Sequence, residues 1–220
     1  MQQDPEQDQS QWYSGHKLPD SLMPTVSSHF CPHCGHALAT RFVAGEPRNS
    51  WHCEQCGEDH HEHPMIVVTC FVSHRDRLLW VRRAIEPKRG KWAIPGGYLE
   101  QGEPLRAGAA RELREEAGVN VDPDRLELYM MGTLTFINQI YVGFRIEVDS
   151  EACVAGPESL ACTFFSRAQC PWQDLAYPEV NDSIEQAYAD LENGTFTQWH
   201  IEMTPERYDR RAIVTKAGQP

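Results

Sequence analysis

The chain has 220 residues, 40% of them hydrophobic, which is enough for one ordinary domain with its own core and a small additional module. Its formal net charge of −12 argues against a protein that is held to nucleic acid by bulk electrostatics. No apolar run approaches the roughly 20 residues of a membrane span, and the N-terminal region lacks the basic start and apolar core of a signal peptide, so we expect a cytoplasmic protein without a membrane partner.

Residues 1–27 are rich in Gln, Asp, Ser and Pro and have little hydrophobic periodicity, which predicts a mobile leader. Two Cys-x-x-Cys-Gly motifs follow, with eighteen residues between Cys34 and Cys53. This spacing is typical of a zinc ribbon, because each glycine permits the tight turn that lets two thiolates face one ion. We therefore predict a small zinc ribbon over residues 28–62, with these ligands of a structural Zn²⁺: Cys31, Cys34, Cys53 and Cys56.

A site with four cysteine ligands has no open position for water, so we expect this zinc ion to stabilise the fold and to take no part in catalysis. Redox-active thiols or a different metal are the alternatives for the cysteines. Several histidines lie nearby in the sequence and could replace a cysteine ligand, although exposed polar side chains are the simpler interpretation: His33, His36, His52, His60, His61 and His63.

Residues 65–73 and 77–81 are apolar and rich in β-forming residues, with a polar turn between them, and they predict a pair of strands. In the basic cluster that follows, Arg82 and Arg83 are the first candidates for contacts with the phosphates of an anionic substrate, and solvated surface charge is the alternative. Residues 91–97 predict a short strand that ends in a pair of glycines, where the backbone could approach an ion closely.

Residues 97–119 read GYLEQGEPLRAGAARELREEAGV and predict a helix over about 104–117, because proline is tolerated at a helix start and glycine is common just after a helix end. Glu112, Glu115 and Glu116 are offset by three and four positions and therefore share one face of this helix. Their mutual repulsion favours a hard divalent cation with oxygen ligands, Mg²⁺ or Mn²⁺, over the alternative of a solvated acidic face. The opposite stripe is apolar and is expected to pack on a sheet: Leu105, Ala109, Leu113 and Ala117.

The rest of the chain predicts three further strands and one helix, in this order: residues 126–135, 139–148, 163–166 and 181–192. A tight turn near Asn138 should join the first two strands, and a loop before the third carries Glu158. Asn181 or Asp182 is expected to cap the helix. Residues 196–220 are expected to form a polar C-terminal tail.

The spacing of residues 97–119, G-x5-E-x7-R-E-U-x-E-E-x-G-U with U apolar, resembles the Nudix box. Together with the stretches FCPHCG, HPMIVVTCFV and AGPESLACTFF, it makes the chain similar to the zinc-ribbon branch of ADP-ribose and FAD diphosphatases, which is related to the NADH pyrophosphatases. The resemblance implies an α/β protein, in which a Nudix α/β/α sandwich around a mixed sheet occupies residues 63–195 and follows the zinc ribbon.

The resemblance also implies a function, namely the metal-dependent hydrolysis of the pyrophosphate bond in a nucleoside diphosphate linked to another moiety, as in FAD, ADP-ribose or NADH. The chain lacks the SQPWPFPxS stretch of NADH pyrophosphatases and has no proline between Pro123 and Pro157, where strict ADP-ribose pyrophosphatases place one. Both departures argue against a narrow preference for NADH or ADP-ribose. Two other functions are open: a catalytically silent module that senses nucleotides or contacts RNA, and a housecleaning nucleoside triphosphatase.

By the same resemblance, Arg111 would orient the helix carboxylates, and Glu103 would support the junction of loop and helix through an ion pair. The general base would be Glu112 or, as the alternative, Glu158, on a loop that could close over the site. The ligands of the catalytic Mg²⁺ or Mn²⁺ would be the following groups: the Gly96 carbonyl and the side chains of Glu112, Glu115 and Glu116.

The base or flavin ring of the substrate would stack on aromatic side chains. Candidates, each alternatively part of the core, are Trp92, Phe136 and Tyr141. Family members are often dimers, so the resemblance implies a homodimer with a small nucleotide as its substrate, and nucleic acid is disfavoured as a partner.

Overall fold

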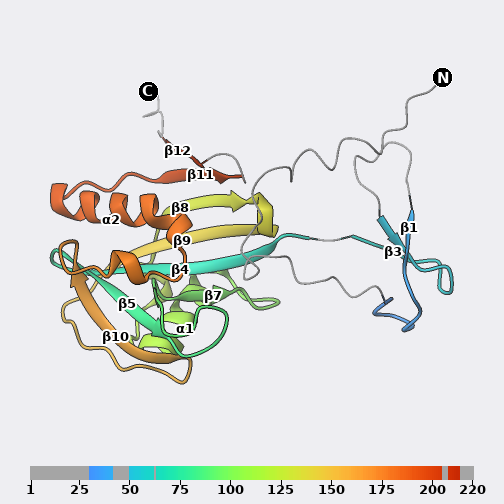
Figure 1. The fold of residues 1–220 in the computed structure, drawn as a ribbon, viewed down its shortest axis with the longest axis horizontal. Coiled ribbons are helices and arrows are strands. Elements are labelled where there is room, and N and C mark those ends of the chain that lie inside the picture. The colour runs from blue at the N-terminus through green and yellow to red at the C-terminus, as the bar shows by residue number, and fades with distance from the viewer. Residues whose placement is uncertain (1–29, 42–49, 62, 205–207, 214–220) are drawn as a thin grey trace.

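A computed structural model describes residues 30–41, 50–61, 63–204 and 208–213 (Figure 1). The predicted leader, residues 1–27, lies outside the described residues. The described residues form a small three-stranded sheet near the N-terminus and a nine-stranded sheet that is accompanied by two α-helices. None of the described helices is both long enough and apolar enough to cross a membrane.

The small sheet has three antiparallel strands: β1 (Ala39–Arg41), β2 (Ser50–His52) and β3 (Asp59–His60). Each Cys-x-x-Cys motif forms a turn in which a glycine N–H donates to a cysteine carbonyl, from Gly35 to Cys31 and from Gly57 to Cys53, both at 2.8 Å. Both glycines have a φ of +75°, where a side chain would be strained. The tight turns predicted from these two glycines are confirmed.

The large sheet is mixed. Its path is β10-β5-β4-β9-β8-β11-β12, with β6 paired to β5 and β7 paired to β4. β4 runs parallel to β9 and β11 runs parallel to β8, while the other pairs are antiparallel. The strands have these bounds: β4 (Met65–His74), β5 (Arg77–Arg83), β6 (Trp92–Ala93), β7 (Gly96–Tyr98), β8 (Glu127–Leu134), β9 (Gln139–Glu147), β10 (Ser159–Ser166), β11 (Trp199–Met203) and β12 (Tyr208–Ala212).

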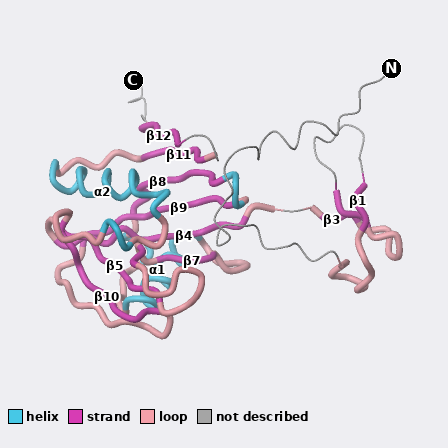
Figure 2. Tube along the Cα trace, viewed as in Figure 1, coloured by secondary structure: helices cyan, strands magenta, loops and turns pink. Residues whose placement is uncertain are grey.

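Two helices, α1 (Leu105–Ala117) and α2 (Asn181–Asn193), cover opposite faces of the large sheet (Figure 2). Successive residues of β4 point to the two faces, as in any strand. Val68 and Cys70 pack with α1 in one core, whereas Phe71 packs with α2 in the other. The predicted α/β/α sandwich is therefore confirmed.

The first predicted pair of strands forms, but the two strands separate soon after their turn. β4 and β5 pair at only two positions, Ser73 with Leu78 and His74 with Arg77. Beyond the turn β5 pairs with β10 and β6, while β4 pairs with β9 and β7. Residues 91–97, predicted as one short strand, therefore contribute to two, β6 on one side and β7 on the other. The glycine pair lies on β7 and enters the sheet beside β4.

The predicted turn near Asn138 is confirmed. A 3₁₀ turn over Thr135–Ile137 follows β8, and Asn138 then adopts the left-handed conformation with a φ of 51° before β9 begins. β10 begins at Ser159, earlier than the predicted start at residue 163. The predicted cap of α2 is wrong, because Val180 holds the N-cap position and no side chain caps the helix. A 3₁₀ turn over Pro178–Val180 leads directly into α2 and replaces the cap.

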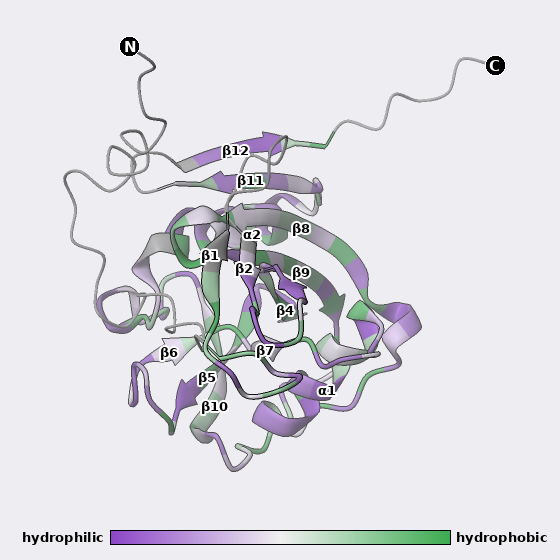
Figure 3. Ribbon diagram, turned by 90° about the vertical axis from the view of Figure 1, so that its right-hand side faces the viewer, coloured by the Kyte–Doolittle hydropathy of each residue, from purple (hydrophilic) through white to green (hydrophobic). Residues whose placement is uncertain are grey.

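The structure corrects the prediction of a polar tail over residues 196–220. Within this segment β11 lies in the large sheet beside β8, and β12 pairs with β11. Ile201 and Met203 of β11 are each 5% exposed, whereas Glu202 between them is exposed. The alternation is typical of a strand, but it is short, and Figure 3 shows the hydrophilic colour of β12 and most of β11.

Candidate active site and metal sites

Four cysteine sulfurs converge between the two turns of the small sheet, and all four lie within 4.8 Å of one another: Cys31, Cys34, Cys53 and Cys56. The Sγ atoms of Cys31 and Cys56 are 3.6 Å apart, and those of Cys34 and Cys53 are 3.4 Å apart. Tetrahedral zinc with bonds of about 2.3 Å to sulfur holds its ligands about 3.8 Å apart, so these residues fit the ion. The backbone N–H of Cys56 lowers the pKa of Cys53 to about 6, which favours the thiolate.

The histidines near this site do not replace a cysteine. His60 Nε2 lies 3.3 Å from Cys31 Sγ, within hydrogen-bonding distance of a thiolate. His52 Nδ1 lies 2.7 Å from a carboxylate oxygen of Asp59. Within the described residues no histidine belongs to the converging group. His60 is therefore placed to hydrogen-bond to the cysteine ligands of an ion.

Helix α1 agrees with the predicted helix to within one residue. Pro104 is its N-cap, and Gly118, with a φ of 65°, is its C-cap. Leu105 is 39% exposed, so the buried stripe begins one turn later than predicted. The other three predicted residues of the stripe are buried in the core beneath β4: Ala109, Leu113 and Ala117.

Arg111 lies at the centre of a network of acidic groups. Its guanidinium donates to both carboxylate oxygens of Glu103, at 2.9 and 3.1 Å. It also donates to Glu112 at 2.8 Å, to Glu115 at 3.2 Å and to the Tyr98 carbonyl at 3.1 Å. These bonds lower the pKa of Glu103 and raise that of Arg111, so both groups remain charged. Arg111 thus connects the loop before α1 to two carboxylates of the helix.

Glu116 is buried at 7% exposure, and its side chain accepts a hydrogen bond of 2.9 Å from the backbone N–H of Gly96. The contact of Gly96 with this carboxylate is therefore made by its N–H, and the metal-binding role of its carbonyl stays a prediction. A Cβ atom at Gly97 would lie 2.7 Å from the carboxyl group of Glu112, so only glycine fits there. Burial raises the pKa of Glu112, and burial raises that of Glu116 to about 7.

Glu115 lies apart from the other two helix carboxylates. Its side chain is half exposed and is held by Arg111 and by Arg114, at 3.2 and 3.3 Å. It does not line the cavity that Glu112 and Glu116 line. Among the described residues, the three carboxylates do not form a converging group like that of the cysteines. The sequence places all three on one helix face, but Arg111 draws Glu115 outward.

A third carboxylate, from Glu158, reaches the same cavity. Its loop is fastened to the end of α1, where the N–H groups of Val154 and Gly156 donate to the carbonyls of Ala117 and Glu116, at 2.8 and 3.0 Å. These are carbonyls of the last turn, which have no partner within the helix. The loop therefore completes the hydrogen bonding of α1 and places Glu158 beside it.

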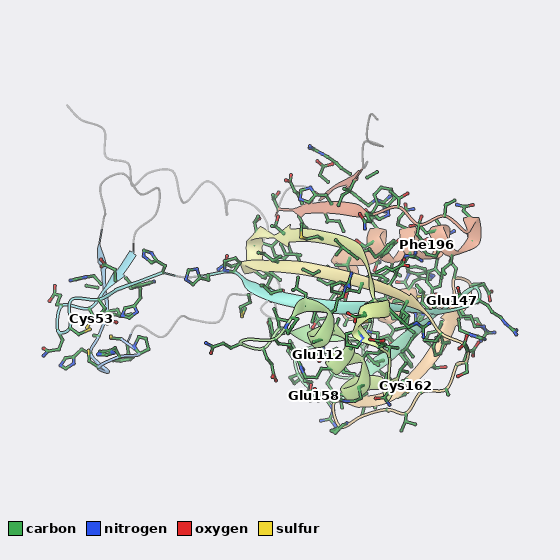
Figure 4. The ribbon with its side chains drawn as sticks, turned by 180° about the vertical axis from the view of Figure 1, so that it is seen from behind. Cys53, Glu112, Glu147, Glu158, Cys162 and Phe196 are labelled. Atoms are coloured by element: carbon green, nitrogen blue, oxygen red, sulfur yellow. The ribbon has the colours of Figure 1, made fainter. Side chains whose placement is uncertain are left out.

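A cavity of about 670 Å³ opens beside these carboxylates, within the range of about 300 to 1,000 Å³ that is typical of small-molecule sites. Glu112, Glu116 and Glu158 line its acidic end together with Arg83 and Arg111, and Glu112 and Glu158 lie near each other in Figure 4. Away from this end the lining is mostly apolar and aromatic, with these rings: Phe71, Trp80, Trp92, Tyr98, Phe136, Tyr141 and Tyr177.

Comparison with known protein families matches residues 63–199, more than half of the chain, to the NUDIX domain. The chain belongs to the Nudix family. A crystal structure of a NUDIX hydrolase from Nitrosomonas europaea agrees with it at a TM-score of 0.73 and 31% identity, over 79% of this chain and 97% of the other.

Two relatives have names that specify a substrate. The chain is 32% identical over 136 residues to the NAD-capped RNA hydrolase NudC of Stutzerimonas stutzeri, which is 61% of this chain and 47% of that protein. It is 33% identical over 57 residues to the ADP-ribose pyrophosphatase of Methanocaldococcus jannaschii, which is 26% of this chain and 34% of that protein. The matches thus span less than half the length of either relative.

Nudix hydrolases generally use Mg²⁺ or Mn²⁺, and the acidic end of the cavity fits such an ion. Its donors are carboxylate oxygens, the ligands that hard divalent cations prefer. Glu116 is buried without a cationic partner bonded to it, and the raised pKa shows that its charged form lacks stabilisation there. Glu112, Glu116 and Glu158 are the residues of this Nudix domain that would hold the ion.

The predicted substrate contacts are divided by the structure. Arg83 lines the cavity, whereas Arg82 is exposed, lies outside the lining and donates to the Gly90 carbonyl at 2.8 Å. Trp92 lines the cavity and packs edge-on against another ring of the core. Phe136 and Tyr141 also line it, with Phe136 only 6% exposed. The three aromatic candidates thus belong to the cavity wall and to the core at once.

The sequence analysis missed several residues of the cavity wall: Thr69, Gln139, Tyr177, Ser183 and Ile184. Thr69 lies two positions from Val67, which also lines the cavity, so the period of two along β4 would have indicated it once that face was known. Ser183 and Ile184 come from the first turn of α2. No local signal connects this helix with the acidic residues of α1, because the two meet only through the sheet.

Proposed function

We propose that this chain is a metal-dependent Nudix hydrolase that cleaves the pyrophosphate bond of a nucleoside diphosphate linked to another moiety, of the FAD, ADP-ribose or NADH type. The products are a nucleoside monophosphate and a second phosphorylated compound. One observation carries the proposal: a single cavity has three carboxylates at one end and an apolar, aromatic lining at the other. The first end suits a diphosphate with its cations, and the second suits a planar ring.

The acidic end requires a cation before it can accept a diphosphate. When bound there, Mg²⁺ or Mn²⁺ would offset the phosphate charge and lower the pKa of an attacking water. Arg83 is the cavity arginine that can turn toward phosphate, since its Nε donates only to a loop carbonyl at 3.0 Å. Arg111 is occupied by carboxylates and holds Glu112 in place. The proton of the water passes to a carboxylate.

Glu112 is our first candidate for that base, and Glu158 is the second. Burial raises the pKa of Glu112, which brings its proton affinity closer to that needed near neutral pH. Arg111 fixes its orientation at 2.8 Å. Glu158 is exposed, although its backbone is fixed to α1 and it lines the same cavity.

The deciding experiment is product identification. FAD, ADP-ribose, NADH and dGTP are each incubated with the protein and Mg²⁺ or Mn²⁺, and the products are separated. We expect two monophosphates, or an equivalent pair, from at least one dinucleotide. Release of pyrophosphate or orthophosphate from dGTP alone would indicate a triphosphatase instead, and binding without cleavage would indicate a sensing module.

Two variants assign the chemistry to this site. We expect Glu112→Gln to lower kcat by about 10² to 10⁴, the range for a general acid–base residue, while Glu192→Gln on the exposed surface of α2 leaves it unchanged. If Glu158→Gln produces the large loss and Glu112→Gln does not, the two roles are reversed.

The similarity to a NAD-capped RNA hydrolase favours one further substrate, a diphosphate whose second moiety continues into RNA. The rim of the cavity includes Met65 and Tyr98, which are 40% and 53% exposed, so a bulky extension can leave the site there. NAD-capped RNA therefore belongs in the substrate panel. We further propose that the four cysteines bind a structural Zn²⁺, and the homodimer implied by the resemblance stays a prediction.

A further inference from the structure

Two hydroxyl groups meet on the cavity wall away from the carboxylates. Thr69 of β4 and Tyr141 of β9 lie on adjacent parallel strands, where Tyr141 is the partner of Val67 and Thr69 is the partner of Gly143. Thr69 Oγ1 donates a hydrogen bond of 2.8 Å to the Tyr141 hydroxyl. Both residues line the cavity, and Thr69 is only 5% exposed. The sequence analysis treated Tyr141 as a stacking ring and did not consider Thr69.

The two hydroxyl groups have one proton more than they use. Each carries one proton, and the bond between them consumes one of the two. Within the part of the chain that the structure describes, neither hydroxyl has another hydrogen-bond partner. Burial raises the pKa of Tyr141 to about 12, so the phenol keeps its proton at neutral pH. A buried donor without an acceptor is unfavourable by about 1 to 3 kcal/mol, so this wall is complete only with a ligand.

The surroundings indicate the chemistry of that ligand. Gln139, two residues before Tyr141 on the same face of β9, also lines the cavity and donates to the Tyr98 hydroxyl at 3.0 Å. The rest of the nearby lining is uncharged: Val67, Phe71, Leu134, Phe136 and Ile137. A planar, uncharged ring with hydrogen-bonding groups on its edge fits this environment, whereas a second phosphate group does not.

We propose that the Thr69–Tyr141 hydroxyl pair determines specificity in this cavity. Tyr141 donates its phenolic proton to a carbonyl oxygen or ring nitrogen of the heteroaromatic group of the substrate, and Thr69 holds the phenol in that orientation. Tyr141 is therefore a substrate contact, and Thr69 is a positioning residue. The inference rests on the proposed function and narrows the substrate to diphosphates with a base or flavin that accepts hydrogen bonds.

The test compares Tyr141→Phe, Thr69→Val and Thr69→Ser on each dinucleotide that the wild type cleaves. One lost hydrogen bond of about 0.7 to 1.4 kcal/mol corresponds to about a threefold to tenfold change in binding. We expect KM to rise by about that factor in Tyr141→Phe, with kcat changed less than about twofold. Thr69→Val should raise KM less, and Thr69→Ser, which keeps the hydroxyl group, should restore the wild-type value.

Tyr188→Phe is the matched control. Its hydroxyl is also buried, but it accepts from Trp80 at 3.0 Å and donates to the Phe165 carbonyl at 2.9 Å, and Tyr188 does not line the cavity. This variant should lower the free energy of unfolding and leave KM unchanged. The double variant Thr69→Val/Tyr141→Phe should show the opposite result, with raised KM and nearly unchanged stability, because both partners are replaced together.

Binding of AMP and FMN without divalent ions, measured by calorimetry, provides a readout that does not need activity. We expect Tyr141→Phe to weaken binding of at least one of them about threefold to tenfold. Equal KM and equal binding in the wild type and Tyr141→Phe would overturn this inference while hydrolysis persists. A wild type that cleaves no dinucleotide would overturn the proposed function instead, and the binding comparison alone would then decide. Failure of the wild type to bind either probe would also overturn the inference.

Discussion

At the scale of single residues, Arg111 decides which carboxylates face the cavity. It makes two bonds to Glu103 and one each to Glu112 and Glu115. The planar guanidinium can serve several carboxylates at fixed angles, which the single ammonium group of lysine cannot do. The sequence predicts the shared helix face, since that follows from the helical period. It does not predict that Glu115 is turned outward, because this depends on how one arginine divides its donors.

The burial of Glu116 predicts an unusual dependence of stability on pH. Its pKa rises from 4.5 to about 7 on folding, so between these values the folded protein holds a proton that the unfolded chain has released. The free energy of unfolding contributed by this group therefore falls as pH rises, by on the order of 3 kcal/mol in total. We expect Glu116→Gln to remove this decline, as measured by urea unfolding at pH 4.5 to 7.5 without added Mg²⁺ or Mn²⁺.

Two comparisons separate this effect from other titrations. Glu192→Gln, an exposed glutamate on α2, should retain the wild-type dependence. Added Mg²⁺ should flatten the wild-type curve above pH 6, because a nearby cation lowers the pKa of a carboxyl group. Identical slopes in the wild type and Glu116→Gln would show that burial of Glu116 has no such effect.

At the scale of elements, the loop that follows β9 positions Glu158 by close contact with α1. Gly156 approaches the helix so closely that a Cβ atom there would lie 1.6 Å from the Glu115 carbonyl oxygen. We therefore expect Gly156→Ala to push the loop away and displace Glu158 from the cavity. Misplacement by about 1 Å can reduce catalysis by about 10²-fold, so kcat should fall by about 10 to 100-fold while the far-ultraviolet circular dichroism spectrum is retained.

Ala155→Ser is the control for this loop, because Ala155 is exposed and precedes the close contact. Its kcat should equal that of the wild type. Full activity in Gly156→Ala would mean either that the loop tolerates the shift or that Glu158 has no part in the reaction. Glu158→Gln distinguishes these two explanations, since only the second predicts that this variant is also fully active.

Strand β11 contributes to the core of the enzyme domain rather than to a tail. Ile201 is 5% exposed and packs in the core beneath α2. We expect Ile201→Ala to lower the free energy of unfolding by about 2 to 5 kcal/mol through lost burial and the cavity left behind. Ile213→Ala, at a position 37% exposed, should change it by less than about 0.5 kcal/mol. Similar small losses in both variants, measured by denaturant unfolding, would contradict the assignment of β11 to the core.

The elements that the sequence predicts well are those with local signals. The period of α1 and the residues at its ends define it, and Asn138 marks the turn between β8 and β9. Elements determined by distant partners are harder to predict. The separation of β4 from β5 depends on the parallel pairing of β4 with β9, more than 60 residues further along the chain. β11 depends in the same way on β8, and its own sequence is too short and polar to indicate a strand.

At the scale of the whole molecule, the chain contains two structures with different sources of stability. The large sheet has a core on each face, and apolar side chains from both helices pack in them. In the small sheet, the fully buried side chains are cysteines rather than aliphatic residues, with Cys31 at 2% and Cys53 at 0% exposure. Hydrophobic burial can stabilise the first structure, but the second needs an ion.

Removal of zinc should therefore unfold the small sheet and leave the large one folded. We expect the wild type to contain one zinc ion per chain by elemental analysis, and Cys53→Ser to lose it, because the remaining thiolates cannot complete a tetrahedral site. Binding at such sites supplies on the order of 10 to 16 kcal/mol at neutral pH, so its loss removes the free energy that folds the ribbon. Proteolysis should then cut within residues 30–61 but leave residues 63–204 intact, with an unchanged thermal transition. Cys170→Ser, a substitution in the core beneath α2, should retain zinc and instead lower that transition. Full zinc content and an uncut ribbon in Cys53→Ser would mean that the four cysteines are not the ligands on which the ribbon depends.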